Sequence, residues 1–174
     1  RLALVTAALQ EDLNGIRVIQ AYRRERASRE QIADLNAAGG VLGKEVKYSA
    51  GDSGDTSTDL ANQTTDRFLA ENVDGIVGPA SSGVALTVID KIAAAGVVLF
   101  SPANTSPVLS TYADKGLYFR VAPSDVLQGA IIASTAIDKG IESMAVIARQ
   151  DAYGEGLADA AAKNFEAGGG TVTD

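Results

Sequence analysis

The sequence contains no cysteine, no histidine and no tryptophan, and aromatic residues make up only 5% of it. Without cysteine or histidine there is no thiol nucleophile, no zinc site of the Cys/His kind and no Ser-His-Asp triad. The absence of cysteine leaves the cellular compartment open. Hydrophobic residues amount to 46% of the chain, so we expect a core built mostly from Ala, Val, Ile and Leu.

Other absences exclude further classes of protein. The formal net charge of −7 argues against nucleic acid as a general partner. No run of 18 apolar residues exists, so we expect no membrane-spanning helix. No signal peptide is visible in this chain. No GxGxxG follows an apolar run, and no set of side chains makes a convincing catalytic or metal site. We therefore expect no enzyme, no cofactor and no metal.

Apolar runs alternate with helical patterns from residue 45 to the end of the chain, which is typical of an α/β sandwich with a mostly parallel sheet. We expect strands at Glu45–Ser49, Gly75–Val77, Val97–Phe100, Leu117–Val121, Ser143–Ala148 and Thr171–Asp174. We expect helices at residues 9–35, from a cap near Asp55 to Asn72, from Ser81 to Gly96, from Ser124 to Asp138 and at Tyr153–Ala167. Leu2–Ala7 fits either a first strand or the first turns of a helix.

The stretch Gly75–Thr105 has the pattern strand, polar loop, helix, strand, polar loop. Both polar loops follow the carboxyl ends of their strands, and ligands bind at that edge of open α/β sheets. Ser81 and Ser82 begin the helix between the strands. Their hydroxyls either cap this helix or help its free N–H groups to hold an anion such as a carboxylate. The second loop, Ser101–Pro107, adds hydroxyls and an amide, which favours the ligand interpretation.

Acidic residues at two loops have simpler interpretations. Asp52 and Asp55 lack the spacing of a calcium loop, so a polar turn at a helix entry is expected there. Asp151 and Glu155 could form a carboxylate pair for acid–base chemistry. The favoured interpretation is that one caps the last helix and the other lies in its first turn, where the helix dipole favours an acid.

From Asn36 onward the chain resembles the extracytoplasmic solute-binding proteins of ABC importers, and within them the branched-chain amino-acid (Leu/Ile/Val) family with the type I periplasmic fold. The segments that carry the resemblance are Asn36–Lys44, Asp52–Thr58, Gly78–Ala85, Ser101–Pro107, Tyr118–Gly129 and Asp151–Ala158. They follow the family's order and spacing. The resemblance implies a three-layer αβα sandwich in each of two lobes, which close on a small ligand.

The resemblance also implies the roles of particular residues. The loop with Ser81 and Ser82 would bind the ligand's carboxylate. The loop Ala103, Asn104 and Thr105 would contribute backbone and hydroxyl groups. Tyr153 would close over the ligand from the second lobe. Residues 1–121 would form the N-terminal lobe and residues 122–174 the start of the second. The resemblance further implies ABC importer membrane subunits as partners and an extracytoplasmic location.

Two features depart from the family. Its members are about twice as long, so the second lobe is incomplete here, and two chains could complete each other's sheet as a homo-oligomer. Residues 1–35 do not look like the family; they hold six of the nine arginines and no lysine. Leu9–Glu25 instead resembles a helix of an ABC exporter membrane domain. A chimera and a divergent first helix both remain open, and the alternative function is an interaction fragment that associates through this Arg-rich helix.

Overall fold

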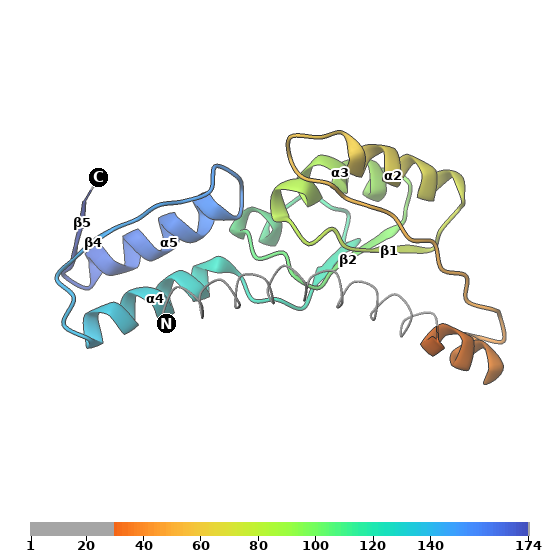
Figure 1. Cartoon of the computed structure of the whole chain (residues 1–174), viewed down its shortest axis with the longest axis horizontal. Coiled ribbons are helices and arrows are strands. Elements are labelled where there is room, and N and C mark those ends of the chain that lie inside the picture. The colour runs from red at the N-terminus through yellow and green to blue at the C-terminus, as the bar shows by residue number, and fades with distance from the viewer. Residues whose placement is uncertain (1–29, 174) are drawn as a thin grey trace, which may run out of the picture. The chain divides into compact units, whose positions relative to one another are not determined.

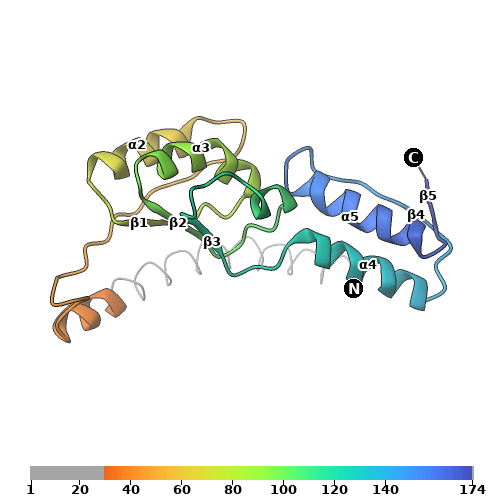
Figure 2. The same cartoon turned by 180° about the vertical axis from the view of Figure 1, so that it is seen from behind.

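The computed structural model of the chain describes residues 30–173, which belong to two compact units, residues 1–50 and 51–174. The second unit contains all the named helices and strands (Figures 1 and 2). They are α2 (Leu60–Ala70), β1 (Gly75–Val77), α3 (Ser82–Ala94), β2 (Val98–Ser101), the short 3-10 helix η1 (Pro107–Ser110), β3 (Tyr118–Arg120), α4 (Asp125–Asp138), β4 (Ser143–Ala145), α5 (Gly154–Ala167) and β5 (Thr171–Thr173).

The first unit is described from residue 30 onward. Residues 30–37 are helical, and the turn that follows is closed by a bridge between Val41 and Lys44. The predicted strand Glu45–Ser49 is wrong. The backbone N–H and C=O of Val46 bond to the side-chain amide of Asn36, at 2.8 and 2.9 Å, so an amide takes the place of a neighbouring strand. The remainder of the predicted helix over residues 9–35, and the segment Leu2–Ala7, lie outside the described residues.

Strands β1, β2 and β3 form a parallel sheet in that order. Helix α3 connects β1 to β2, which makes the predicted βαβ unit. Parallel pairing brings the carboxyl ends of all three strands to one edge of the sheet. The loops that follow β1 and β2 therefore emerge side by side, as the sequence pattern predicts.

The core of this region lies between the sheet and helices α2 and α3, which cover one of its faces (Figures 1 and 2). Alternate strand residues point inward: Leu99 and Tyr118 are in register on neighbouring strands and both are buried. Helix α3 presents a wide apolar side to the core, where Val88, Ile89 and Ile92 are buried, and its exposed side carries Thr87 and Asp90. This is the pattern of a helix that covers one face of a sheet.

The opposite face of the same sheet carries a row of apolar side chains. Val77, Phe100 and Phe119 are in register across the three strands and are 78, 37 and 51% exposed. Within residues 30–173, two of the three layers of the expected sandwich are thus present over this sheet. The overall class is nevertheless the predicted one, a mixed α/β fold with parallel sheets.

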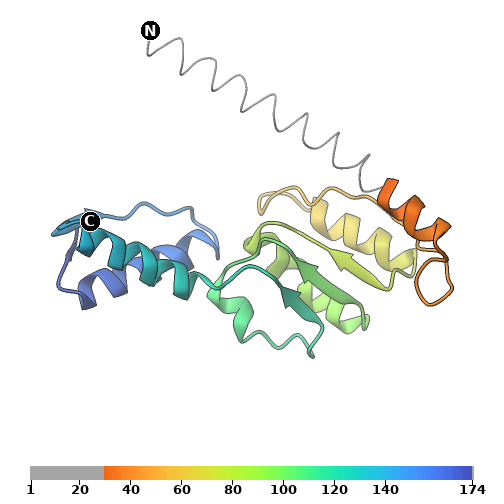
Figure 3. The same cartoon turned by 90° about the horizontal axis from the view of Figure 1, so that it is seen from below.

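The C-terminal part of the second unit pairs helix α4 with helix α5 and strand β4 with strand β5 (Figure 3). The two strands are parallel, and α5 connects them. The helices approach closely at Gly129, where an added Cβ would lie 2.5 Å from the Cβ of Ala160. Phe165 is completely buried beneath Gly170. This region therefore depends on small residues at a helix contact rather than on a large apolar cluster.

A side chain caps the start of α3 and of α4, but none caps the start of α2. Ser81 and Ser124 accept N–H bonds in the first turns of α3 and α4, so Ser124 is the expected cap, and Ser81 makes the capping bond that was one of its two open interpretations. The predicted cap of α2 is wrong. Its N-cap position is Asp59 and makes no side-chain cap. The Asp55 carboxylate instead accepts hydrogen bonds from the N–H and hydroxyl of Ser57 in a tight turn.

Candidate functional site

The first part of the candidate site is the start of α3, directly after β1. Ser81 caps the 13-residue helix: its Oγ accepts the N–H of Val84 at 3.4 Å. The hydroxyl hydrogen of Ser81 is left for another acceptor. The side chain is half-buried, so this donor is reachable from solvent. With the partial positive charge of the helix N-terminus beside it, this position favours an anion.

Ser82 plays a different part from its neighbour. Its side chain is 2% exposed, and its Oγ accepts the backbone N–H groups of Thr105 and Ser106, both at 3.2 Å. The Ser82 hydroxyl therefore ties the loop after β1 to the loop after β2. The structure brings the two predicted loops together through this side chain.

Asn104 completes the same connection and is completely buried. Its Nδ2 donates to the carbonyl oxygens of Pro79 and Ala80, at 3.0 and 2.9 Å, and its Oδ1 accepts the hydroxyl of Tyr118 at 3.1 Å. The Asn104 N–H donates to Ser101 Oγ at 3.0 Å. We call Ser82, Ser101 and Asn104, with the backbone groups that they bond, the loop junction.

Next to the loop junction are three buried polar atoms with no partner among the described residues: Thr105 Oγ1, Ser106 Oγ and Asp125 Oδ2. We call Thr105, Ser106 and Asp125 the unpaired cluster. Its backbone is well fixed, because the Asp125 N–H donates to the Thr105 carbonyl at 2.9 Å and Arg120 donates to the Ser106 carbonyl at 2.8 Å. The unpaired side-chain atoms therefore belong to an ordered region, and buried polar groups without partners are uncommon in proteins.

The Asp125 carboxyl has a raised pKa, chiefly because burial disfavours its charged form. The nearby Thr105 hydroxyl and the charge of Arg120 act in the opposite direction and oppose the rise. The Thr105 hydroxyl thus lies close to the carboxyl, although neither Thr105 Oγ1 nor Asp125 Oδ2 completes a hydrogen bond. Asp125 Oδ1 accepts from Gln128 Nε2 at 3.0 Å. A cationic hydrogen-bond donor that reaches this carboxyl would stabilise its charged form.

Asp125 and Ser106 were not among the site residues predicted from the sequence. Asp125 directly follows the cap Ser124. The helix dipole is enough to explain an acid in the first turn of a helix, so the sequence offered no reason to predict a ligand-binding role for Asp125. Its position could have indicated a site residue, because Asp125 begins the first helix after the third strand of the sheet, beside the strand-end loops.

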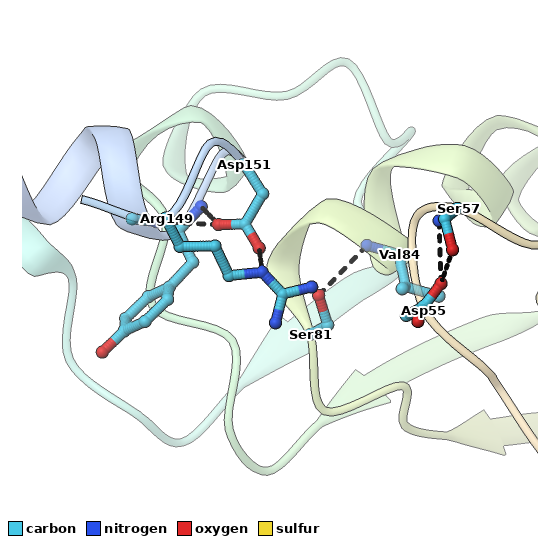
Figure 4. Close-up of polar contacts among 8 residues, drawn as sticks. Asp55, Ser57, Ser81, Val84, Arg149 and Asp151 are labelled. Atoms are coloured by element: carbon cyan, nitrogen blue, oxygen red, sulfur yellow. Dashed lines mark hydrogen bonds and ion pairs between the residues drawn. The ribbon is translucent and has the colours of Figure 1, made fainter.

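A third loop approaches the start of α3. An added Cβ on Gly83 would lie 2.8 Å from Thr56 Cγ2, 3.4 Å from Asp151 Cβ and 3.8 Å from Ser81 Oγ. Asp151 Oδ1 accepts the N–H groups of Tyr153 and Gly154, which confirms that one acid caps the entry to α5. Figure 4 shows this loop facing the Ser81 end of α3.

The remaining predicted site residues are more exposed. Ala103 lies on the surface of its loop and donates its N–H to Ser101 Oγ at 3.3 Å. Tyr153 stands at the start of α5 with its side chain 41% exposed. Within residues 30–173, no hydrogen bond joins the Tyr153 hydroxyl to the strand-end loops. Their proposed contacts with a ligand stay predictions.

A cavity of about 230 Å³ lies beside β1 and is lined in part by Gly78, Pro79 and Ala80 of the loop that follows this strand. Its walls include Ala61, Phe68, Ile76 and Val88, and none of the six predicted site residues is among them. Neither the unpaired cluster nor Ser81 opens into it. We therefore assign the candidate site to the side of the strand-end loops where Ser81 and the unpaired cluster lie, and not to this cavity, whose other walls come mainly from α2, α3 and β1.

Residues 30–173 contain no group of three or more acidic residues placed to hold a metal ion. None of the helices described has the length and apolar character needed to cross a membrane. The arrangement that remains is a donor-rich helix start and a buried acceptor cluster on neighbouring loops. Its polarity is complementary to a small molecule that carries both an anionic and a cationic group.

Comparisons with known proteins show which family this chain resembles. The family model described as "Periplasmic binding protein" matches residues 18–174. The chain is 28% identical over 169 residues to the Leu/Ile/Val-binding protein BraC3 of Rhizobium johnstonii, covering 95% of this chain and 45% of that protein. It is 27% identical over 157 residues to Leu/Ile/Val-binding protein homolog 1 of Brucella abortus, covering 88% of this chain and 41% of that protein.

Solved structures give the same result. The leucine-binding protein LivK of Thermotoga maritima superposes with a TM-score of 0.73 at 27% identity, over 82% of this chain and 41% of that one. An ABC transporter substrate-binding protein of Desulfitobacterium hafniense, solved in complex with Leu, gives a TM-score of 0.66 at 29% identity, over 82% and 42%. This chain spans less than half the length of these proteins.

The family match begins at residue 18, inside the segment Leu9–Glu25 that resembles an exporter helix. The similarity to BraC3 covers nearly the whole chain. An exporter-derived N-terminus is therefore not supported. The parallel sheet, the paired strand-end loops and the extended match together establish that the chain belongs to the periplasmic binding protein family.

Proposed function

We propose that this chain is the ligand-holding part of a solute-binding component of an ABC importer, and that its ligand is a branched-chain amino acid or a similar small carboxylate. The observation that carries the proposal is the unpaired cluster beside the start of α3. One end of the site offers donors and a helix N-terminus, and the other offers a buried carboxylate and two hydroxyls. A zwitterion matches this polarity.

The carboxylate end of the ligand would meet Ser81 and the free N–H groups at the start of α3. Hydrogen bonds to an ionised carboxylate are stronger than those between neutral groups. Ser82 and Asn104 serve the site indirectly, because their polar side-chain atoms are occupied in the loop junction. Their task is to hold the two loops at a fixed separation.

The ammonium end would meet Asp125 Oδ2 and the Thr105 hydroxyl, with the Ser106 hydroxyl nearby. An ammonium group has three donors and no acceptor, so it suits acceptors that lack partners. Its charge would also offset the cost of the buried carboxylate. Ala103 would add backbone groups, and Tyr153 would cover the ligand from the second lobe.

The same family membership implies partners and a location that we include in the proposal. The partners are the membrane subunits of an ABC importer, and the location is extracytoplasmic. Closure of two lobes about a hinge would trap the ligand, as in other binding proteins of this kind. A homo-oligomer formed by sheet completion stays a prediction, and light scattering at several protein concentrations would test it.

Isothermal titration with leucine, isoleucine and valine tests the proposed ligand. Two leucine analogues separate the two ends of the site: 4-methylpentanoate lacks the ammonium, and leucinamide lacks the carboxylate. We expect leucine to bind and each analogue to bind roughly 10-fold or more weakly, since each loses charge-assisted hydrogen bonds. In a parallel melt, ligand at 100 times Kd would add about 2.7 kcal/mol to stability. No binding by any amino acid or small carboxylate would overturn the proposal.

A further inference from the structure

Arg149 lies on the loop between β4 and α5, and its side chain is 61% exposed. Its Nε is 2.7 Å from Asp151 Oδ2. Asp151 is itself firmly held: its side chain is 5% exposed, and its other oxygen accepts the N–H groups of Tyr153 and Gly154. The guanidinium is therefore anchored at one edge by a carboxylate that cannot move freely.

The anchoring leaves the rest of the guanidinium unoccupied. Only Nε takes part in the ion pair, and within residues 30–173 neither terminal nitrogen of Arg149 has a hydrogen-bond or ion-pair partner. These two nitrogens form one side of the planar fork that matches a carboxylate in bidentate fashion. Asp151 is nearly buried, so the ion pair offsets the charge of a desolvated carboxylate, but Nε alone does this and the two terminal nitrogens are left available.

The position of the guanidinium relates it to the proposed site. Asp151 Cβ and Ser81 Oγ lie 3.4 and 3.8 Å from the same point, the place of an added Cβ on Gly83. Figure 4 shows the Arg149 side chain extending from Asp151 toward Ser81. Two hydrogen bonds from Ser57 lower the pKa of the Asp55 carboxyl, and the positive charge of Arg149 lowers it further. The guanidinium thus lies near the start of α3, and its charge reaches the loop of Asp55.

We infer that Arg149 is a specificity-determining residue whose two terminal nitrogens bind the same ligand carboxylate as Ser81. This inference rests on the proposed function, and it adds a cation to the anion-holding end of that site. The ligand carboxylate joins the start of α3 to the loop before α5, so binding draws these two segments together. Arg149 makes the site select a free carboxylate over an amide or an ester of the same molecule.

The test is titration of Arg149→Met and Arg149→Lys with two probes, leucine and leucinamide. Met keeps much of the side-chain length but has no charge, and Lys keeps the charge but has no fork. We expect Arg149→Met to weaken leucine binding roughly 10-fold or more and to leave leucinamide binding unchanged, because only leucine offers a carboxylate. Arg149→Lys should lose part of that affinity. Equal losses for both probes, or none for either, would overturn the inference.

Lys163→Met is the matched control. It removes one positive charge from the same region, and Lys163 lies nine residues into α5, about 13 Å along the helix from its start. We expect it to change neither affinity. If the wild-type chain binds leucine but Arg149→Met has no effect, the inference about Arg149 fails and the proposed function stands. If the wild-type chain binds no amino acid or small carboxylate, both fail.

Discussion

The loop junction and the unpaired cluster lie next to each other and both consist of buried polar side chains. They differ in whether those side chains have hydrogen-bond partners. In the loop junction, the side chains of Ser82 and Asn104 are buried and bonded to backbone groups across the two loops. In the unpaired cluster, three equally buried side-chain atoms have no partner among the described residues. The first arrangement stabilises the fold, whereas the second costs stability that a bound molecule can restore.

This contrast explains why two adjacent serines have separate roles. Ser81 points its hydroxyl to the half-exposed start of α3, and Ser82 points into the junction between the loops. Substitutions in the loop junction should therefore lower stability first and affinity second. Substitutions in the unpaired cluster should do the reverse. The predictions below test that division, from the largest expected effect to the smallest.

Asn104→Ala should be the most destabilising of these changes. It removes two donors and one acceptor, and it leaves the carbonyls of Pro79 and Ala80 and the hydroxyl of Tyr118 without their partner. We expect a loss on the order of 3 kcal/mol in the free energy of unfolding, because each buried group without a partner carries a desolvation cost. Chemical denaturation without ligand measures it. A loss below about 1 kcal/mol would show that the loop junction does not hold the loops together.

Ser82→Ala should have the second largest effect. Its hydroxyl is the acceptor for the N–H groups of Thr105 and Ser106, and alanine would leave two buried donors unsatisfied. We expect a loss of about 2 kcal/mol. Ser81→Ala is the control, because it removes only a long 3.4 Å cap bond to Val84 and should cost about 1 kcal/mol or less. Equal losses for the two serines would contradict the difference drawn between them.

The sequence allowed prediction of features that depend on neighbouring residues. The Ser124 cap and the strand–helix alternation follow from local chemistry, and the structure confirms them; for Ser81 the sequence left capping and anion binding both open. The failure at Glu45–Ser49 has a physical reason: alternation marks a strand only if another strand pairs with it, and Asn36 takes that place. The role of Ser82 was equally hidden, since its partners lie 23 and 24 residues away.

Asp125→Asn should change the pH dependence of stability. Burial raises the pKa of the Asp125 carboxyl above its ordinary value of 3.8, so the folded state binds the proton more tightly than the unfolded state. The resulting contribution is present below that ordinary value and is lost as the pH rises through the raised pKa. Arg120 and the Thr105 hydroxyl act against the rise and limit it.

Asparagine does not titrate, so the stability of the wild-type chain relative to Asp125→Asn should fall as the pH rises above about 4. Denaturation midpoints between pH 3.5 and 8 measure the difference. In the presence of leucine the trend should reverse for the wild-type chain, because the ligand's ammonium favours the charged carboxyl. A difference that stays constant over this range would mean that burial of Asp125 does not perturb its titration.

Thr105→Val should be the least destabilising change and the most informative about the unpaired cluster. Valine has nearly the shape of threonine, and the Thr105 Oγ1 that it removes has no partner among the described residues. Its loss should change the free energy of unfolding by roughly 0.5 kcal/mol at most, in either direction, because no native hydrogen bond is broken and one desolvated hydroxyl disappears. Leucine affinity should nevertheless fall, since valine cannot accept from an ammonium group. Denaturation without ligand and titration with leucine, on the same preparation, give both quantities. A large loss of stability with unchanged affinity would show that Thr105 belongs to the loop junction. Asp125 would then be the only residue of the three left as a ligand-holding group.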